Sequence, residues 1–205
     1  MKVLLLNGSP KQGNTYRALQ EVAKTLQEEH IETQIIGIDY EPQADCIGCG
    51  ACHGCEPCAI GGACYERVRE ALETADGLIV GSPVYYAGPS GAICSLLDRV
   101  FMSCKPLLEY KPAASGAVCP RGGASAAFDR LNKYFQIYNM PVVSSQYWNM
   151  IYGHVPGEAE LDAEGLQTMR TLARNMAFLI KSIALGKEQF GLPEKEAKIK
   201  TNFIR

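Results

Sequence analysis

The N-terminal part of the chain places a strand, a polar loop and a helix in immediate succession, and this order constrains the fold most. Residues 3–6 are a fully apolar run, which predicts a buried strand, and the Gly, Ser, Pro and Asn residues that follow predict a loop. Beyond the loop, apolar residues recur at helical spacing: Ala18, Leu19, Val22, Ala23 and Leu26. A loop that enters a helix N-terminus presents N–H groups to an anion, so residues 9–15 are predicted to bind a phosphate.

This loop lacks the two commonest nucleotide-binding signatures. A GxxxxGK[ST] motif would need Lys followed by Ser or Thr after Gly13, where this sequence has Asn14-Thr15. A GxGxxG turn is also absent. An ordinary strand-to-helix turn with an N-cap stays the alternative interpretation of this stretch.

Strands and helices alternate along the rest of the chain. Further strands are expected at residues 32–38, 76–81, 111–119 and 141–145, and helices at residues 66–74, 90–104, 124–138 and 161–185. Such alternation is typical of a parallel sheet with helices on both faces, joined by right-handed crossovers. We therefore predict an α/β fold with a doubly wound five-stranded parallel sheet, in a single domain over residues 1–205.

One common strand order of a doubly wound sheet is 2-1-3-4-5, and we expect that order here. In a sheet of this order the ligand lies at the carboxyl ends of strands one and three, where the order reverses. Three predicted loops leave the carboxyl ends of strands one, three and four, namely residues 9–15, 82–88 and 120–123. We expect these three loops to face one cleft.

Charge and hydropathy exclude several classes of partner. The net charge of −2, from 20 basic and 22 acidic residues, gives no electrostatic footprint for nucleic acid or an anionic membrane. No apolar run approaches the length of a membrane span, and the N-terminus enters a strand without the zones of a signal peptide. We expect no nucleic-acid partner, no membrane partner and a cytoplasmic location.

Six of the nine cysteines fall within one short segment: Cys46, Cys49, Cys52, Cys55, Cys58 and Cys64. Residues 45–64 are too rich in Gly and Cys for a regular element and predict an excursion after the second strand. Adjacent CxxC pairs bring thiolates close enough to share one metal centre, and four thiolates satisfy a [4Fe-4S] cluster. A four-thiolate zinc site and free thiols without metal are the alternatives.

Two loops resemble those of the flavodoxin-like, NADPH-dependent FMN reductases. SPKQGNT at residues 9–15 resembles the SPxxxGNT phosphate loop of that family, and GSPVY at residues 81–85 resembles its loop after the third strand. Further similar positions are Ser90-Gly91, Leu97-Asp98-Arg99 and Thr201-Asn202-Phe203. The resemblance runs from residue 3 to the C-terminus and implies a flavodoxin-like fold with FMN as cofactor.

The resemblance also implies which residues contact FMN: Ser9, Lys11, Gly13, Asn14, Thr15, Ser82, Pro83, Val84, Tyr85, Tyr86, Arg121, Gly122 and Gly123. Pro83 and the two tyrosines give a stiff apolar shelf for a planar ring, and glycines permit close backbone approach. Packing beneath the loop is the alternative for the tyrosines, and a surface cation is the alternative for Arg121. No residue is assigned a catalytic role, because the flavin performs the chemistry itself.

Four of the cysteines carry a second resemblance. Cys46, Cys49, Cys52 and Cys58 form CxxCxxCxxxxxC, which is similar to the compact motif of the iron-sulfur flavoprotein branch of this family. In that branch a [4Fe-4S] cluster exchanges electrons with the flavin. Cys55 and Cys64 are additional, so either of them could replace Cys58 as the fourth ligand.

The leading functional prediction is an FMN-dependent oxidoreductase. It would transfer electrons between NAD(P)H, or a ferredoxin-like protein, and an acceptor, with the cluster as a relay. An electron carrier without a small-molecule substrate and a zinc-stapled interaction module without flavin are the alternatives. The resemblance further implies a homodimer or a homotetramer.

Overall fold

The computed structural model describes residues 1–197, 199 and 201. The strands are β1 Lys2–Asn7, β2 Glu32–Gly37, β3 Gly77–Tyr85, β4 Gly88–Pro89, β5 Ala113–Cys119 and β6 Met150–Tyr152. The helices are α1 Asn14–Glu28, α2 Ala63–Thr74, α3 Gly91–Ser103, α4 Ala124–Ile137 and α5 Ala163–Phe190, with 3-10 turns η1 Lys105–Leu107 and η2 Glu158–Glu160. All five helices and the first four predicted strands form within a few residues of their expected positions.

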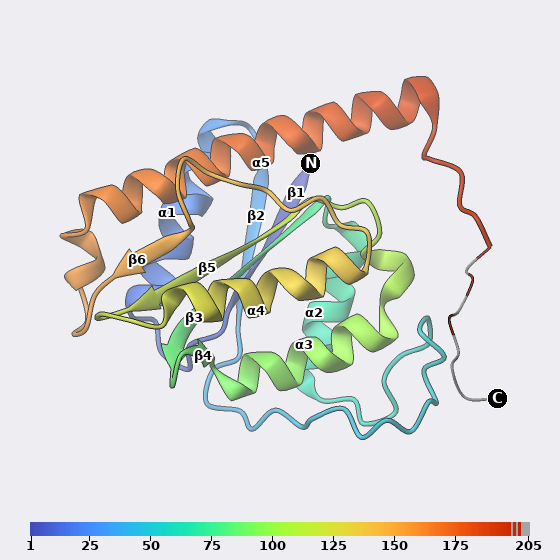
Figure 1. The fold of residues 1–205 in the computed structure, drawn as a ribbon, viewed down its shortest axis with the longest axis horizontal. Coiled ribbons are helices and arrows are strands. Elements are labelled where there is room, and N and C mark those ends of the chain that lie inside the picture. The colour runs from blue at the N-terminus through green and yellow to red at the C-terminus, as the bar shows by residue number, and fades with distance from the viewer. Residues whose placement is uncertain (198, 200, 202–205) are drawn as a thin grey trace.

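The strands form one sheet in the order β2-β1-β3-β5-β6, and all neighbours along this path are parallel. This confirms the doubly wound sheet and its predicted order. Helices α1 and α5 cover one face, and α2, α3 and α4 cover the other, as Figure 1 shows. The carboxyl ends of β1 and β3 therefore lie side by side at the point where the strand order reverses.

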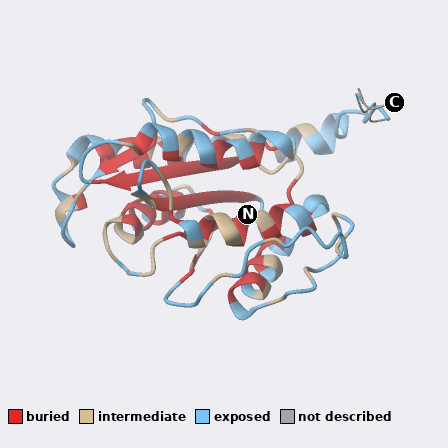
Figure 2. Cartoon of the chain, turned by 60° about the horizontal axis from the view of Figure 1, so that its bottom comes forward, coloured by how far each residue is buried: buried red, intermediate tan, exposed pale blue. Residues whose placement is uncertain are grey.

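The unbroken apolar run of β1 is explained by burial on both sides of the sheet. Val3 and Leu5 pack in the core against α1 and α5, whereas Leu4 and Leu6 pack in the core against α2, α3 and α4. Figure 2 shows the buried strands between the more exposed outer surfaces of the helices. Because successive strand residues point to opposite faces, a strand covered on both sides needs apolar residues at every position.

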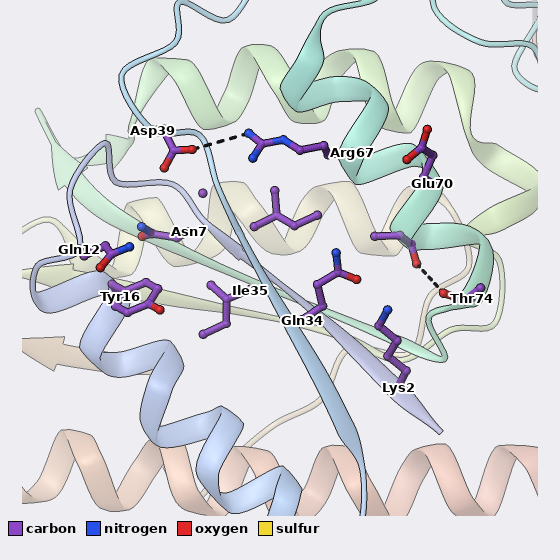
Figure 3. Close-up of a pocket in the computed structure, with 13 residues that line it drawn as sticks. Lys2, Asn7, Gln12, Tyr16, Gln34, Ile35, Asp39, Arg67, Glu70 and Thr74 are labelled. Carbon is purple, nitrogen blue, oxygen red and sulfur yellow. Dashed lines mark hydrogen bonds and ion pairs between the residues drawn. The ribbon is translucent and has the colours of Figure 1, made fainter.

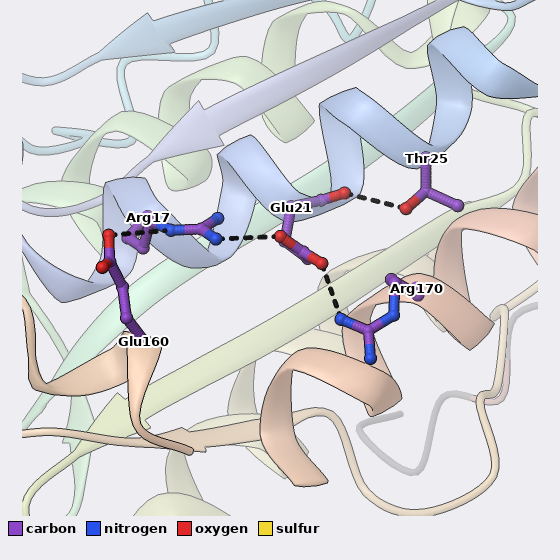
Figure 4. A network of polar contacts seen from close by, with 5 residues as sticks. All are labelled: Arg17, Glu21, Thr25, Glu160 and Arg170. Carbon is purple, nitrogen blue, oxygen red and sulfur yellow. Dashed lines mark hydrogen bonds and ion pairs between the residues drawn. The ribbon is translucent and has the colours of Figure 1, made fainter. Parts of the chain in front are cut away.

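A polar network joins α1 to the C-terminal part of the chain on one face of the molecule (Figure 4). Arg17 and Arg170 contact the Glu21 carboxylate from two sides, at 3.0 and 2.7 Å, and Arg17 also reaches Glu160 at 3.3 Å. Burial opposes ionisation of Glu21, but the hydrogen bonds from Arg170 and Arg17 outweigh it and lower its pKa. This nearly buried carboxylate therefore braces α1 against α5.

The boundaries predicted for the fifth strand are wrong. Residues 141–145 make a single bridge to β5, between Val142 and Ala113, and the chain pairs with β5 again only at β6. Polar side chains interrupt the ladder between these two points. The Ser145 hydroxyl donates to Asn149 Oδ1 at 2.7 Å, and Asn149 Nδ2 donates to the Ser115 carbonyl at 3.0 Å. Serine and asparagine here offer the backbone an alternative to continuous pairing.

The loop expected after the third strand is instead a β-hairpin. β3 continues to Tyr85, turns at Tyr86 and Ala87, and pairs antiparallel with β4, so the sheet has six strands where five were predicted. Both turn residues have positive φ, 50° and 60°, as in a type I′ hairpin turn. Tyrosine and alanine rarely adopt this conformation, so their types gave no turn signal.

At the C-terminal end, residues 194–197 are exposed. Thr201 is also exposed, whereas Asn202 and Phe203, which belong to the same resembling stretch, lie outside the described residues. Among the described helices, none combines the length and the apolar composition needed to cross a bilayer.

Candidate functional site

The loop after β1 is folded around the side chain of Asn7. This nearly buried amide donates to the carbonyls of Ser9 and Lys11, at 3.1 and 3.3 Å, and accepts from the Ser9 N–H at 3.2 Å. The Lys11 N–H donates to Ser9 Oγ at 3.2 Å, and the Lys11 side chain is exposed. The loop thus has a defined shape of its own and presents the Lys11 side chain at its surface.

The start of α1 suits an anion. Gly13 is the N-cap and makes no side-chain cap hydrogen bond, and the first turn contains no acidic residue. The Asn14 side chain is used elsewhere, since Nδ2 donates to the Val155 carbonyl at 3.0 Å and Oδ1 accepts from the Ala159 N–H at 3.2 Å. The N–H groups of the first turn therefore have no side-chain partner in the described part of the chain, and the helix dipole favours a negative group there.

The ends of β1 and β3 are joined by backbone contacts. The Gly8 N–H donates to the Gly81 carbonyl at 2.7 Å, and the Ser90 hydroxyl donates to the Gly8 carbonyl at 2.7 Å. A Cβ at Gly8 would lie only 2.9 Å from the Gly81 oxygen and 3.0 Å from Ile93 Cβ. Glycine is therefore required at position 8 for the two strand ends to meet.

The hairpin after β3 presents its aromatic tip to solvent. Tyr85 is 51% exposed and Tyr86 is fully exposed, so neither side chain is packed beneath the loop. Ser82, by contrast, is fully buried, and its hydroxyl donates to the Pro83 carbonyl at 2.8 Å and accepts from the Ser90 N–H at 3.0 Å. Ser82 shapes the hairpin from within, while the tyrosines form its outer surface.

The loop after β5 lies against this hairpin. Gly123 has φ +89°, and a Cβ there would lie 2.9 Å from the Ala87 Cα and 3.2 Å from Val84 Cγ1. Arg121 and Gly122, just before it, are exposed. The structure therefore brings the loops after β1, β3 and β5 to one edge of the sheet, as their positions in the sequence predict.

A separate groove runs along the edge strand β2 (Figure 3). It has a volume of about 520 Å³ and extends from Lys2 at one end to Gln12 and Tyr16 at the other. Asp39 and Arg67 form an ion pair of 3.6 Å across its wall. The groove touches the loop after β1 but contains no residue of the hairpin or of the loop after β5, so it is not the predicted cleft.

Cysteines of the excursion line a small cavity against the C-terminal part of α3. Its volume is about 80 Å³, and its walls include the four predicted ligands Cys46, Cys49, Cys52 and Cys58. Cys55 is exposed and outside the cavity. Cys64 is buried in the core beside the Gly37 carbonyl, and burial raises the pKa of its thiol.

The four cysteines share this cavity without converging on one point. Among the described residues, no three Cys, His, Asp or Glu side chains already stand close enough to hold a single metal ion. A zinc ion needs its sulfur ligands at about 2.3 Å from one centre. A [4Fe-4S] cluster is bulkier and is held by four thiolates that surround it.

The cysteine segment is anchored to the adjacent helices at a few points. The Tyr65 hydroxyl, fully buried, accepts from the Cys58 N–H at 2.9 Å and lies 2.7 Å from the Ser103 hydroxyl. The Lys105 N–H donates to the Gly54 carbonyl at 3.2 Å. These contacts hold the segment against α2 and the end of α3.

The cavity and the three strand-end loops lie at opposite ends of α3. The helix begins after Ser90, which contacts the loop after β1, and Met102 near its C-terminus lines the cavity. Twelve residues at a rise of about 1.5 Å separate them by about 18 Å along the helix. Within one chain, the two candidate sites are therefore distinct places.

Four residues that shape these sites were not assigned a site role from the sequence: Asn7, Tyr65, Ser90 and Arg99, the last of which lines the cysteine cavity. Asn7 carried a signal, because a polar residue that ends an apolar strand is typical of an Asx-turn. The roles of Tyr65 and Arg99 depend on where a distant segment packs, which local pattern does not reveal.

A parallel sheet in this order, with polar loops at its switch point, defines the flavodoxin-like class of α/β proteins. The sequence model of the family described as NADPH-dependent FMN reductase matches residues 1–154. An iron-sulfur flavoprotein of Methanocaldococcus jannaschii is 33% identical over 196 residues, which cover 89% of this chain and 99% of the relative. The chain belongs to the NADPH-dependent FMN reductase family, in its iron-sulfur flavoprotein branch.

Other similar proteins agree with this placement. An iron-sulfur flavoprotein of Methanosarcina thermophila is 26% identical over 92% of this chain and all of the relative. The flavodoxin, WrbA-like protein of Agrobacterium tumefaciens superposes with a TM-score of 0.63 at 20% identity, covering 88% of this chain and 97% of that one. FerB, an NAD(P)H:(acceptor) oxidoreductase of Paracoccus denitrificans, superposes with a TM-score of 0.58 at 20% identity, covering 93% and 99%. At these identities the solved structures support the fold.

Proposed function

We propose that this chain binds FMN at the carboxyl edge of the sheet and works as a flavoprotein oxidoreductase. The observation that carries the proposal is the direct contact between the loops after β1, β3 and β5 at the switch point. The FMN phosphate would be bound at the uncapped start of α1 by the loop that contains Ser9, Lys11, Gly13, Asn14 and Thr15. Asn14 contributes by holding the loop to the segment after β6.

The isoalloxazine ring is proposed to lie against the hairpin. Pro83, Val84, Tyr85 and Tyr86 give an apolar shelf, and the turn holds Tyr86 outward in a strained left-handed conformation. Gly123 permits the loop after β5 to approach the hairpin closely, and Gly122 and Arg121 are exposed beside it, where Arg121 adds a cation. Bound FMN supplies hydride and single-electron chemistry, while the residues of the chain bind it, orient it and set its electrostatic surroundings.

We further propose a [4Fe-4S] cluster in the cavity of the cysteine segment. The four cysteines that line the cavity are Cys46, Cys49, Cys52 and Cys58, which favours Cys58 as the fourth ligand. Exposed Cys55 and core-packed Cys64 are less suited to that role. The cysteine pairs also follow one another without the longer loop that usually separates the CxxC pairs of a zinc site, which favours a cluster over one zinc ion.

The proposed electron donor is a reduced nicotinamide nucleotide, as the description of the family suggests. A ferredoxin-like protein is the other proposed donor, with the cluster as its point of entry. We also expect a homodimer or homotetramer, in which the exposed tyrosines of the hairpin would be covered by another copy.

Anaerobic purification followed by a visible spectrum and by flavin, iron and sulfide analysis tests both cofactors together. We expect about one FMN and about four irons per chain. Addition of NADPH or NADH without any protein partner should then bleach the flavin absorbance. If only a ferredoxin-like protein reduces the flavin, the chain is an electron carrier and not an enzyme with a small-molecule substrate. Colourless protein that contains zinc alone would contradict the proposal.

A further inference from the structure

One buried cation borders the cysteine cavity. Arg99 lies near the end of α3, is only 2% exposed, and lines the cavity together with the four cysteines and Met102. A charged side chain is rarely buried unless it is paired. The surroundings of this guanidinium therefore need an explanation.

The protein satisfies only part of the Arg99 side chain. Nη1 donates to the Gly61 carbonyl, Nη2 makes a long contact of 3.5 Å to Gln43 Oε1, and the guanidinium lies 5.2 Å from the Tyr65 ring centroid. Nε is buried and has no hydrogen-bond partner among the described residues. No carboxylate of the described part of the chain pairs with Arg99.

A buried cation without an anion is unfavourable, because burial removes hydration that neutral hydrogen-bond acceptors only partly replace. The cavity supplies the missing anion once it is filled. Four thiolates around a [4Fe-4S] core carry a net negative charge, and each electron that the group takes up adds one more negative charge. A fixed neighbouring cation then stabilises the reduced form more than the oxidised form.

We propose that Arg99 is the charge-compensating residue of the cluster and raises its reduction potential. This inference rests on the proposed function, since it requires that the cavity holds a cluster. It assigns Arg99 to electrostatic control of the cluster and not only to the anchoring of Gly61. It also explains why a buried arginine whose Nε lacks a partner among the described residues lines this cavity.

The test compares Arg99→Gln, which removes the charge, with Arg99→Lys, which keeps it. The matched control is Arg67→Gln, which removes an arginine charge from nearby α2 that is paired with Asp39 and does not line the cavity. Cluster potentials are measured in the FMN-loaded, iron-loaded proteins by anaerobic titration with dithionite, followed by electron paramagnetic resonance. We expect the equilibrium constant for one-electron reduction to fall at least tenfold in Arg99→Gln, which is about 59 mV. Arg99→Lys and Arg67→Gln should stay close to the wild type.

A second pair of variants serves if Arg99→Gln does not fold. Met102 lines the same cavity and is 48% exposed, so a longer polar side chain can be accommodated there. Met102→Lys should raise the potential relative to Met102→Gln. If the cluster potential of Arg99→Gln equals that of the wild type, this inference alone is overturned. The same holds if Met102→Lys and Met102→Gln have equal cluster potentials. Wild-type protein without iron and sulfide would overturn the proposed cluster and this inference with it.

Discussion

The two candidate sites differ in how much of their shape the chain makes by itself. The first is the carboxyl edge of the sheet where FMN is proposed to bind, called here the flavin edge. There the Gly8 N–H donates to the Gly81 carbonyl and the Ser90 hydroxyl donates to the Gly8 carbonyl, so separate segments are joined directly. Residues 38–62, which carry the candidate cluster ligands, contain no helix or strand. Contacts within the chain therefore define the flavin edge, whereas we expect the shape of the cysteine segment to depend on the cofactor proposed for it.

The largest expected effect is on iron content, and it distinguishes Cys58 from Cys55. Cys58→Ser should remove nearly all cluster iron, because the cavity loses one of four thiolates, while FMN content stays unchanged. The control is Cys55→Ser, since Cys55 is exposed and outside the cavity. Iron and flavin analysis checks both. Loss of iron in Cys55→Ser with retention in Cys58→Ser would exchange the two assignments.

The next largest expected effect is on stability and FMN affinity, when the contact between the ends of β1 and β3 is disrupted. Gly8→Ala places a methyl group 2.9 Å from the Gly81 oxygen, so the strand ends must separate, at a cost of about 1–3 kcal/mol in unfolding free energy. FMN affinity should fall with it, as measured by flavin fluorescence and urea denaturation. Gly91→Ala is the control, because nothing lies within 4 Å of a Cβ there. Unchanged FMN affinity in Gly8→Ala would contradict the proposed junction.

A smaller, pH-dependent effect concerns the ion pairs of Glu21 with Arg17 and Arg170, which join α1 to α5. The folded state lowers the pKa of Glu21, so its ionised form adds stability above the unfolded pKa, and this is lost as pH falls through the folded pKa. Glu21→Gln should therefore destabilise the protein by about 1–2 kcal/mol near pH 7 and by progressively less below about pH 4. Urea denaturation across this range checks it. An equal difference at all pH values would rule out the role of the ionised carboxylate.

The smallest effect concerns the hairpin tip. Ala87 has φ 60°, which glycine adopts without strain, so Ala87→Gly should raise the unfolding free energy by about 0.5–1 kcal/mol. Exposed Ala126 in α4 provides the control, since Ala126→Gly in a regular helix should lower it by a similar amount. Thermal unfolding measures both. Destabilisation by Ala87→Gly would show that the methyl contact with the Gly123 loop outweighs the backbone strain.

The sequence was most informative where local pattern and global fold agree. Apolar runs such as β1 and helical spacings such as that of α1 predict their elements because burial on defined faces determines residue type. The alternation of elements predicted a doubly wound parallel sheet, and the flavodoxin-like strand order placed the three loops at one edge. The interrupted fifth strand did not, because Asn149 and Ser145 act through hydrogen bonds to residues outside their own segment.

For the sites, the sequence by itself determined the polar loop before α1 and the regular spacing of the cysteines, since both depend on neighbouring residues. Only the tertiary structure decided which cysteines share a cavity, that Tyr86 points outward, and that Arg99 lies buried beside the thiols. These features arise where segments far apart in the chain pack together. Local sequence pattern specifies the elements, but the packing of distant segments sets the charge and shape around each site.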